Sequence, residues 1–277
     1  VGEMKQSKVK EKYTIFGSTG FLGKNLKSFL IKKKYKVFCP SKKKYKFNQD
    51  LGHVFYCAGT SDSIANPDKA LSANLVYLNK VILNNSFRTF TYFSSIRVYS
   101  LNKSTKENDI IRCNLFEKGS YFKKLKLAAE SLCLQINNPK IRIIRLSNLY
   151  GKYFDKQIYL MPTILRNFRK NKTIKLSISL NSTKNYLDVD DALRISIKIA
   201  KEGKYRIYNV AAKSSIKVGD IIKILRIFSK VKLEISKNYK TTHESKINTN
   251  RIRKELNFSE KVSFNKSFFN LIKNHYK

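Results

Sequence analysis

The chain has 277 residues, 42% of them hydrophobic, and carries a formal net charge of +38 at pH 7. This apolar fraction excludes a disordered chain, and the length suits one large domain or a large domain with a small appendage. No apolar run approaches the ~20 residues of a membrane span, and the polar, lysine-rich start from Val1 to Lys12 lacks the apolar segment of a secretory signal.

The first predicted element is a short apolar strand, Tyr13–Phe16, which ends in a glycine-rich turn and is followed by a helical pattern over Phe21–Lys33. Gly17 permits the turn, Gly20 lets backbone N–H groups approach a pyrophosphate, and Gly23 lets the helix pack closely on the sheet. The phosphates would lie at the positive end of the helix dipole. The spacing therefore indicates a dinucleotide site, although any tight strand-to-helix turn favours glycine even without a ligand.

Strands and helices alternate as far as about Gly151. This alternation predicts an α/β chain with a parallel sheet covered by helices on both faces. Ligands of such sheets bind beyond the carboxyl ends of the strands, where the motifs Ala58-Gly59, Ser94-Ser95 and Asn148 fall. The further predicted strands are Lys36–Cys39, His53–Ala58, Phe90–Ser94 and Ile141–Leu146, and the further helices are Pro67–Leu83 and Tyr121–Ile136.

After Gly151 the alternation of strand-like and helix-like segments becomes irregular. It becomes strand-like again over Arg206–Val210 and helix-like over Val218–Phe228. No internal repeat or low-complexity linker is visible.

Several segments, in this order along the chain, resemble those of one protein family. They are Gly17–Gly23, Phe55–Gly59, Ser72–Leu75, Tyr92–Tyr99, Ile144–Gly151, Asn185–Ala192 and Ile207–Ala211. Together they resemble the extended short-chain dehydrogenases/reductases, the NAD-dependent epimerase/dehydratase family that modifies nucleotide sugars. The resemblance implies a Rossmann-like, doubly wound parallel sheet over residues 12–151 with about 185–210. Residues 152–184 and 211–277 would form a small C-terminal lobe that binds the substrate.

The chemistry of this family implies a serine, a tyrosine and a lysine four residues after the tyrosine. The tyrosine exchanges a proton with a substrate hydroxyl, the lysine holds the cofactor ribose and lowers the tyrosine pKa, and the serine hydrogen-bonds the same substrate oxygen. The resemblance assigns Ser95 and Lys126, but the residue four before Lys126 is Phe122. Tyr121 is five residues before it, about 140° around an ideal helix. Either Tyr121 reaches the site from an irregular helix start and completes the catalytic set, or Phe122 fills the tyrosine position and ordinary proton transfer is lost.

The resemblance also implies binding residues and a cofactor. The second strand usually ends in an acid when NAD is bound, whereas the segment Cys39–Lys44 contains no acid, which favours NADP over NAD. The implied substrate-binding residues are Ser95, Asn148 and Lys184, and no metal is expected. The implied cofactor-binding residues are Gly17, Thr19, Gly20, Phe21, Leu22, Gly23, Ser41, Lys42, Ala58, Gly59, Asn74 and Lys126.

Some positions depart from the family pattern. Lys184 and Asn185 stand where an arginine and an aspartate are usual, and Asp188 stands where histidine is common. Lys184 either contacts a substrate phosphate or is one more surface lysine. Ile96 and Arg97 follow Ser95, so the acid that dehydratases often place there is missing.

These features predict an NAD(P)-dependent nucleotide-sugar epimerase or 4-keto-sugar reductase, an isomerase or oxidoreductase of polysaccharide biosynthesis. Its substrate would be a nucleoside-diphosphate sugar. The alternative is a catalytically impaired protein of the same fold that binds a nucleotide and RNA or another polyanion. The lysines are spread along the whole chain, so we expect nucleic-acid binding to be non-specific at most.

The cysteines indicate the compartment. Cys39, Cys57, Cys113 and Cys133 have no metal-ligand spacing, so we expect reduced thiols. We therefore predict a cytoplasmic protein without membrane attachment, and a homodimer is left open.

Overall fold

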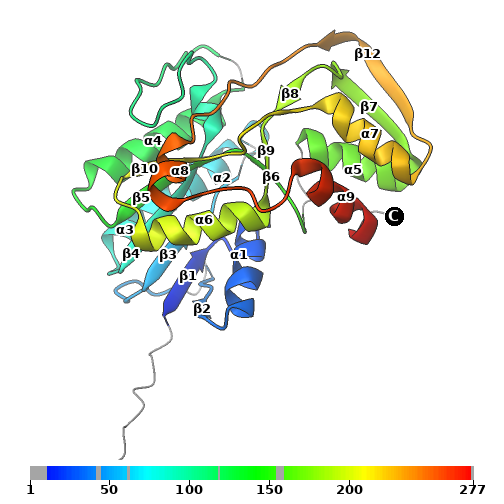
Figure 1. Cartoon of the computed structure of the whole chain (residues 1–277). Coiled ribbons are helices and arrows are strands. Elements are labelled where there is room, and N and C mark those ends of the chain that lie inside the picture. The colour runs from blue at the N-terminus through cyan, green and yellow to red at the C-terminus, as the bar shows by residue number, and fades with distance from the viewer. Residues whose placement is uncertain (1–10, 42–44, 61–62, 118, 154–158, 276–277) are drawn as a thin grey trace, which may run out of the picture.

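A computed structural model describes residues 11–41, 45–60, 63–117, 119–153 and 159–275 of the chain. Within these residues the central element is a six-stranded sheet in the order β10-β5-β4-β3-β1-β2 (Figure 1), and all of its neighbouring strands pair in parallel. The strands are β1 (Lys12–Phe16), β2 (Lys36–Phe38), β3 (His53–Tyr56), β4 (Thr89–Ser95), β5 (Ile141–Leu146) and β10 (Ile207–Val210).

The order of the strands reverses between β1 and β3. The chain runs from β1 outward to β2, then returns to β3 and continues outward in the other direction through β4 and β5. A reversal of this kind opens a crevice at the carboxyl ends of the two central strands, where ligands of open α/β sheets bind. The predicted doubly wound parallel sheet is confirmed.

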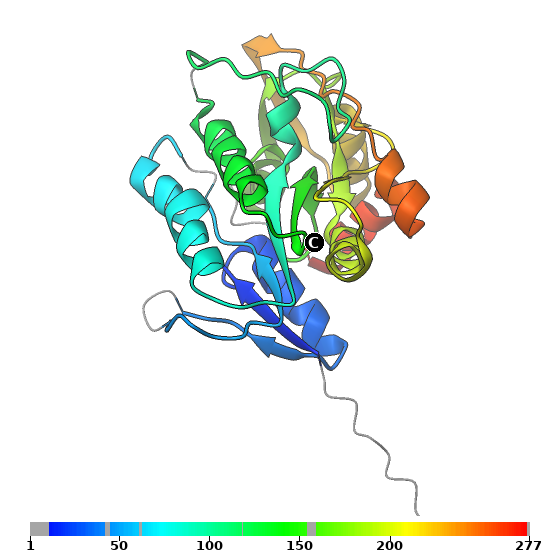
Figure 2. The same cartoon turned by 90° about the vertical axis from the view of Figure 1, so that its left-hand side faces the viewer.

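Helices cover both faces of the sheet, as Figure 2 shows from the side. One face is covered by α1 (Phe21–Lys32) and α6 (Val189–Glu202), which also contact each other. The other face is covered by α3 (Tyr77–Leu83) and α4 (Tyr121–Gln135). The sheet has apolar side chains on both faces, and the helices on each side bury them.

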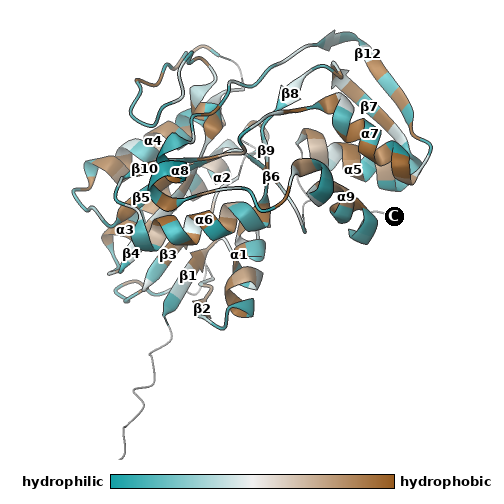
Figure 3. Ribbon diagram, in the orientation of Figure 1, coloured by the Kyte–Doolittle hydropathy of each residue, from teal (hydrophilic) through white to brown (hydrophobic). Residues whose placement is uncertain are grey.

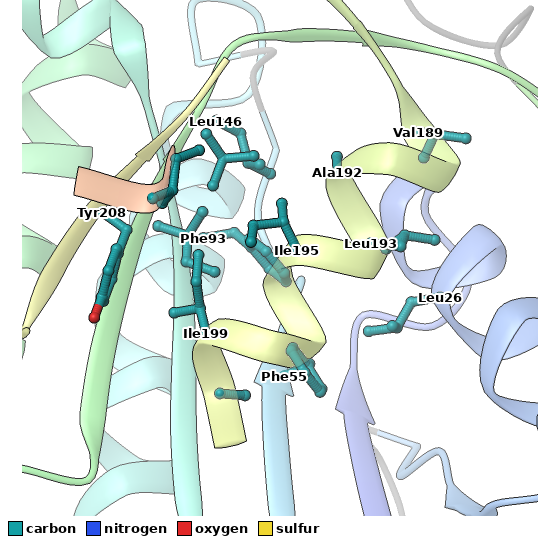
Figure 4. Packing of buried hydrophobic residues seen from close by; sticks show 14 of the residues in the cluster. Leu26, Phe55, Phe93, Leu146, Val189, Ala192, Leu193, Ile195, Ile199 and Tyr208 are labelled. Carbon is teal, nitrogen blue, oxygen red and sulfur yellow. The ribbon is translucent and has the colours of Figure 1, made fainter. Parts of the chain in front are cut away.

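Side chains alternate between the two faces along each strand. Ile15, Phe55 and Phe93 belong to the cluster under α1 and α6, whereas Phe16 and Tyr56 belong to the cluster under α3 and α4. Figure 4 shows the first cluster from close by, with the apolar side of α6 lying on strands β3, β4, β5 and β10. The α6 residues that Figure 4 labels are Val189, Ala192, Leu193, Ile195 and Ile199.

Helix α6 was not predicted from the sequence. Ile195, Ile197 and Ile199 alternate with polar residues in the manner of a strand. The helix begins because the Asp188 side chain accepts a hydrogen bond from the backbone N–H of Asp190 at 2.8 Å, which caps its first turn. Figure 3 shows hydrophobic and hydrophilic residues side by side on α6, as an amphipathic helix requires.

A further hydrophobic cluster lies among the later elements, in the upper right of Figure 1. Strand β12 pairs in parallel with β7, and α5 and α7 contribute buried side chains to this cluster. The proposed division of the chain into two domains stays a prediction. The remaining elements are α2 (Pro67–Leu71), β6 (Asn148–Tyr150), α5 (Leu160–Asn171), β7 (Thr173–Ile178), β8 (Thr183–Lys184), β9 (Tyr186–Asp188), β11 (Ile216–Lys217), α7 (Val218–Phe228), β12 (Lys232–Lys240), α8 (Asn250–Leu256) and α9 (Phe264–His275).

Candidate active site

A cavity of about 330 Å³ lies at the carboxyl ends of the central strands. Its walls come from segments that are far apart in the sequence: the glycine turn, the ends of β3 and β4, helix α4, the segment after β5, and the later part of the chain. Of the residues predicted for the site, it brings together Gly20, Phe21, Leu22, Ala58, Gly59, Asn74, Ser95, Lys126, Asn148 and Lys184.

The three glycines of the first turn have different surroundings. Gly17 has φ +80°, and a Cβ atom there would lie 2.5 Å from the backbone nitrogen of Ala58. A Cβ atom on Gly23 would lie 2.2 Å from the carbonyl oxygen of Gly17. Gly17 and Gly23 are therefore required by the fold itself. A Cβ atom on Gly20 would only make an ordinary contact of 3.6 Å with that oxygen, and Gly20 lines the cavity.

The N-terminus of α1 is suited to an anionic group. Gly20 is the N-cap residue and has no side chain, and no described side chain caps the first turn. The first N–H groups of a helix have no partner within the helix, and the helix dipole places partial positive charge there. These donors and the open space at Gly20 fit the pyrophosphate of a dinucleotide.

Asn74 also lines the cavity and lies within a π-helical turn, Ser72–Val76, that interrupts the predicted helix over Pro67–Leu83. Its side-chain NH₂ donates to the carbonyl oxygens of Ala70 at 2.9 Å and Thr60 at 3.2 Å. Its Oδ1 atom is buried and accepts no hydrogen bond from the described residues. Buried polar atoms in native proteins almost always have partners, so this orphaned oxygen fits a donor on a bound dinucleotide.

Lys126 and Phe122 lie on one face of α4. The Lys126 ammonium donates to the carbonyl oxygen of Phe93 at 2.8 Å and lies 5.6 Å from the centre of the Phe122 ring. Both side chains line the cavity, whereas Tyr121 does not. The helix is regular from its start, since the backbone N–H of Lys124 donates to the carbonyl of Ser120 at 3.0 Å. The structure therefore places Phe122, rather than Tyr121, one turn before the lysine.

Burial governs the electrostatics of Lys126. Its side chain is almost wholly removed from water, and this desolvation lowers the pKa of the ammonium to about 8, against the opposing influence of Glu130. No carboxylate among the described residues forms an ion pair with it. The lysine thus remains protonated at neutral pH while its charge is poorly compensated, which favours an anionic or hydroxyl-bearing ligand beside it.

Another part of the cavity wall is formed by Asn148, Lys184 and Glu244. The Asn148 side-chain NH₂ donates to Glu244 Oε2 at 3.0 Å, and the Lys184 ammonium is 3.4 Å from Glu244 Oε1. The backbone N–H of Asn185 donates to the same carboxylate at 2.8 Å. Lys184 is therefore an ordered residue of the cavity wall, with its charge matched by a carboxylate.

Sequence reasoning missed part of this wall. Glu244 lies far along the chain from Asn148, and no local pattern indicates that they meet. Tyr159 and Tyr186 also line the cavity, and burial raises the pKa of the Tyr186 hydroxyl. The buried Ser147 hydroxyl on the same wall has no hydrogen-bond partner among the described residues. Ser147 could have been found, because it directly precedes Asn148 in the motif after β5.

Other predicted residues lie elsewhere. Gly17, Gly23 and Thr19 belong to the glycine turn without lining the cavity, and Ser41 is exposed after β2. Lys42 lies outside the described residues. Within the described ranges, no group of His, Cys, Asp or Glu side chains could hold a metal ion, and no helix there has the length and apolar character needed to cross a bilayer.

Comparison by sequence decides the family. The model of the NAD dependent epimerase/dehydratase family matches residues 49–211, more than half of the chain. The chain belongs to this family. No curated protein matches it by sequence.

Several solved structures share the fold at low sequence identity. One is RMD from Pseudomonas aeruginosa complexed with NADPH, 19% identical over 95% of this chain and 99% of that one, with a TM-score of 0.75. A second is UDP-glucuronic acid 4-epimerase from Bacillus cereus with UDP-glucuronic acid and NAD, 16% identical over 96% and 100%, with a TM-score of 0.78. A third is UDP-glucose 4-epimerase from Thermotoga maritima with UDP-glucose, 15% identical over 95% and 97%, with a TM-score of 0.74.

Proposed function

We propose that this chain is an NAD(P)-dependent enzyme that modifies a nucleoside-diphosphate sugar, as an epimerase or a 4-keto-sugar reductase. The observation that carries the proposal is the continuity of the cavity. One cavity is lined by Gly20 and Asn74, which fit a dinucleotide, by Ser95 and Lys126, and by Asn148 and its neighbours. A dinucleotide and a sugar substrate would meet near Ser95.

Each part of the cavity has a distinct role in this proposal. The N-terminus of α1 and Asn74 would hold the cofactor, whose nicotinamide supplies or accepts the hydride. Lys126 would hold the ribose next to the nicotinamide, and the Ser95 hydroxyl would hydrogen-bond the substrate oxygen at the reacting carbon. Lys184 would lie near the substrate phosphates, where a diphosphate competes with Glu244 for its ammonium.

The cofactor is proposed to be NADP in preference to NAD. The support is the sequence after β2, which offers Ser41 and three lysines and no acid. Charge-assisted hydrogen bonds to a 2′-phosphate would favour NADPH by roughly 1.5–3 kcal/mol for each well-formed bond. Equal or tighter binding of NADH would show that these lysines are ordinary solvated side chains.

One observation favours a second candidate function. Phe122 occupies the cavity wall one turn before Lys126, where a tyrosine would serve as acid or base. A protein that binds the cofactor and the nucleotide sugar without converting them is consistent with this side chain. The two candidates differ in turnover and share the binding steps.

The binding steps are tested by titrating the protein with NADPH and NADH while following nicotinamide fluorescence. Gly20→Val should abolish binding and leave the thermal unfolding temperature nearly unchanged, because its branched side chain would fill the space for the pyrophosphate. Gly23→Ala is the contrasting variant, since its Cβ would overlap the Gly17 carbonyl and disrupt the fold. Failure of the wild type to bind either dinucleotide would overturn the enzyme proposal.

A further inference from the structure

Arg97 contributes a cation to the cavity that the proposed reaction does not use. It lies in a short 3₁₀ turn, Ile96–Tyr99, directly after β4, and its side chain lines the cavity. The guanidinium carbon is 4.8 Å from the centre of the Tyr159 ring, which lines the same cavity. The side chain is exposed, and no acidic residue in the described part of the chain forms an ion pair with it.

The two other cations of the cavity differ from Arg97 in their surroundings. The Lys184 charge is matched by Glu244 at 3.4 Å, and the Lys126 ammonium is buried against the Phe93 carbonyl. Arg97 lies over an aromatic ring instead, and this cation–π contact leaves the N–H groups of the guanidinium available for a ligand. A guanidinium can bind a carboxylate through two parallel hydrogen bonds.

The backbone places Arg97 beside the reacting group rather than beside the nucleotide. The N–H of Arg97 donates to the Ser95 hydroxyl oxygen at 3.2 Å, so the two residues share one turn. In the proposed function Ser95 contacts the sugar hydroxyl that reacts. A guanidinium that starts from this turn and rests on Tyr159 would therefore lie along the sugar ring.

We propose that Arg97 selects a substrate whose sugar carries an anionic group, specifically a carboxylate, so that the substrate is a nucleotide-linked uronic acid. The proposal rests on the proposed function, because that function places the sugar next to Ser95. Arg97 would act as a specificity-determining residue through a planar, two-point contact with the carboxylate. A neutral sugar would leave the guanidinium with only water or a hydroxyl as its partner.

The experiment compares matched pairs of ligands that differ only at the carboxylate. Isothermal titration calorimetry of the NADPH-saturated protein is carried out with UDP-glucose and UDP-glucuronate. The same two sugars linked to guanosine diphosphate and to thymidine diphosphate are then compared in the same way. We expect the carboxylated member of at least one pair to bind about 10- to 100-fold more tightly, as a charged two-point hydrogen bond predicts. Arg97→Gln should remove this preference, and Arg97→Lys should restore only part of it.

A control variant separates a specific contact from general attraction. Lys103→Gln removes the same charge from an exposed position in the same loop, outside the cavity wall. It should leave the preference for the carboxylated sugar unchanged. If it lowered the preference as much as Arg97→Gln does, long-range attraction would account for the effect and the proposal would fail.

The other outcomes are equally decisive. An equal loss of both members of a pair in Arg97→Gln would place the guanidinium on the diphosphate and overturn the proposal. A wild type that prefers neutral sugars, or binds no nucleotide sugar while it still binds NADPH, would overturn it as well. Loss of all dinucleotide binding is the separate result that would refute the proposed function.

Discussion

Phe122 is the residue on which the proposed chemistry of the site depends most. We expect Phe122→Tyr to create or raise turnover by roughly 10²–10⁴-fold, because it places a hydroxyl one turn before Lys126, and a positioned acid or base has about that effect. Tyr121→Phe should be nearly silent, since Tyr121 does not line the cavity. The assay follows NAD(P)H oxidation or sugar interconversion over a panel of nucleotide sugars. A large loss in Tyr121→Phe with a silent Phe122→Tyr would return the proton transfer to Tyr121.

Lys126 should couple stability to pH. Burial lowers its pKa from 10.5 to about 8, so between these values the unfolded state binds more protons than the folded state. The contribution of Lys126 to the free energy of unfolding should therefore rise with pH from about 8 to 10.5 and be least favourable below about 8. Lys126→Met should remove this slope and stabilise the protein at neutral pH by ~1–3 kcal/mol. Urea denaturation of both proteins across this range measures the difference, and a difference independent of pH would contradict the assignment.

At the level of elements, a buried ion pair joins α4 to the central strands. The Arg145 guanidinium on β5 is 2.6 Å from the Glu130 carboxylate on α4, and the Ser94 hydroxyl on β4 donates to the same carboxylate. Both charged side chains are buried. Because Glu130 lies one turn after Lys126 and Ser94 directly precedes Ser95, this pair joins the two elements that carry the proposed catalytic side chains.

Breaking this pair should destabilise the fold strongly. Arg145→Met leaves the Glu130 carboxylate buried without its partner, and we expect a loss of about 3–5 kcal/mol in the free energy of unfolding. The double variant with Glu130→Gln should lose less than the sum of the two single variants, because each removes the same interaction. The surface pair of Lys198 with Glu202 is the control, and removing it should change stability by less than ~1 kcal/mol. Additive losses in guanidinium denaturation would show that the pair is not coupled.

The sequence predicts the helices and strands of the fold where local sequence patterns are strong. The early strands and α4 were expected within one or two residues, because apolar runs bounded by Gly, Pro or polar residues mark strands of a buried sheet. Helix α6 was missed because its alternating isoleucines imitate a strand. Only the Asp188 cap and the apolar face that the helix buries favour a helix. The π-helical turn at Asn74 has no pattern in the sequence, and neither has the hydrogen bond that the Asn74 amide donates to the Thr60 carbonyl oxygen.

In the candidate site too, some residues could be predicted from local sequence patterns and others could not. The glycine turn, Ser95 and Lys126 could be found from spacing, because each follows a strand or lies at helical intervals. The position of Glu244 could not, since it depends on how the segment after β12 returns to the cavity. The choice between Tyr121 and Phe122 also needed the structure, because one residue in a helix rotates a side chain by about 100°.

The charge of the whole molecule leads to the last prediction. With a net charge of +38 from lysines and arginines spread along the chain, the surface should attract any polyanion without reading its sequence. We expect weak binding to short RNAs, equal for unrelated sequences of one length, and an affinity that falls by about 10³–10⁵ between 50 and 200 mM salt if about 6–10 phosphates are contacted. Fluorescence anisotropy with labelled RNAs measures this dependence, and saturating NADPH should leave it unchanged, since the surface and the cavity are separate. Tight binding of one RNA at physiological salt, or its displacement by NADPH, would instead support a nucleotide- and RNA-binding protein, in which Phe122 marks a site that has kept its ligands without its proton donor.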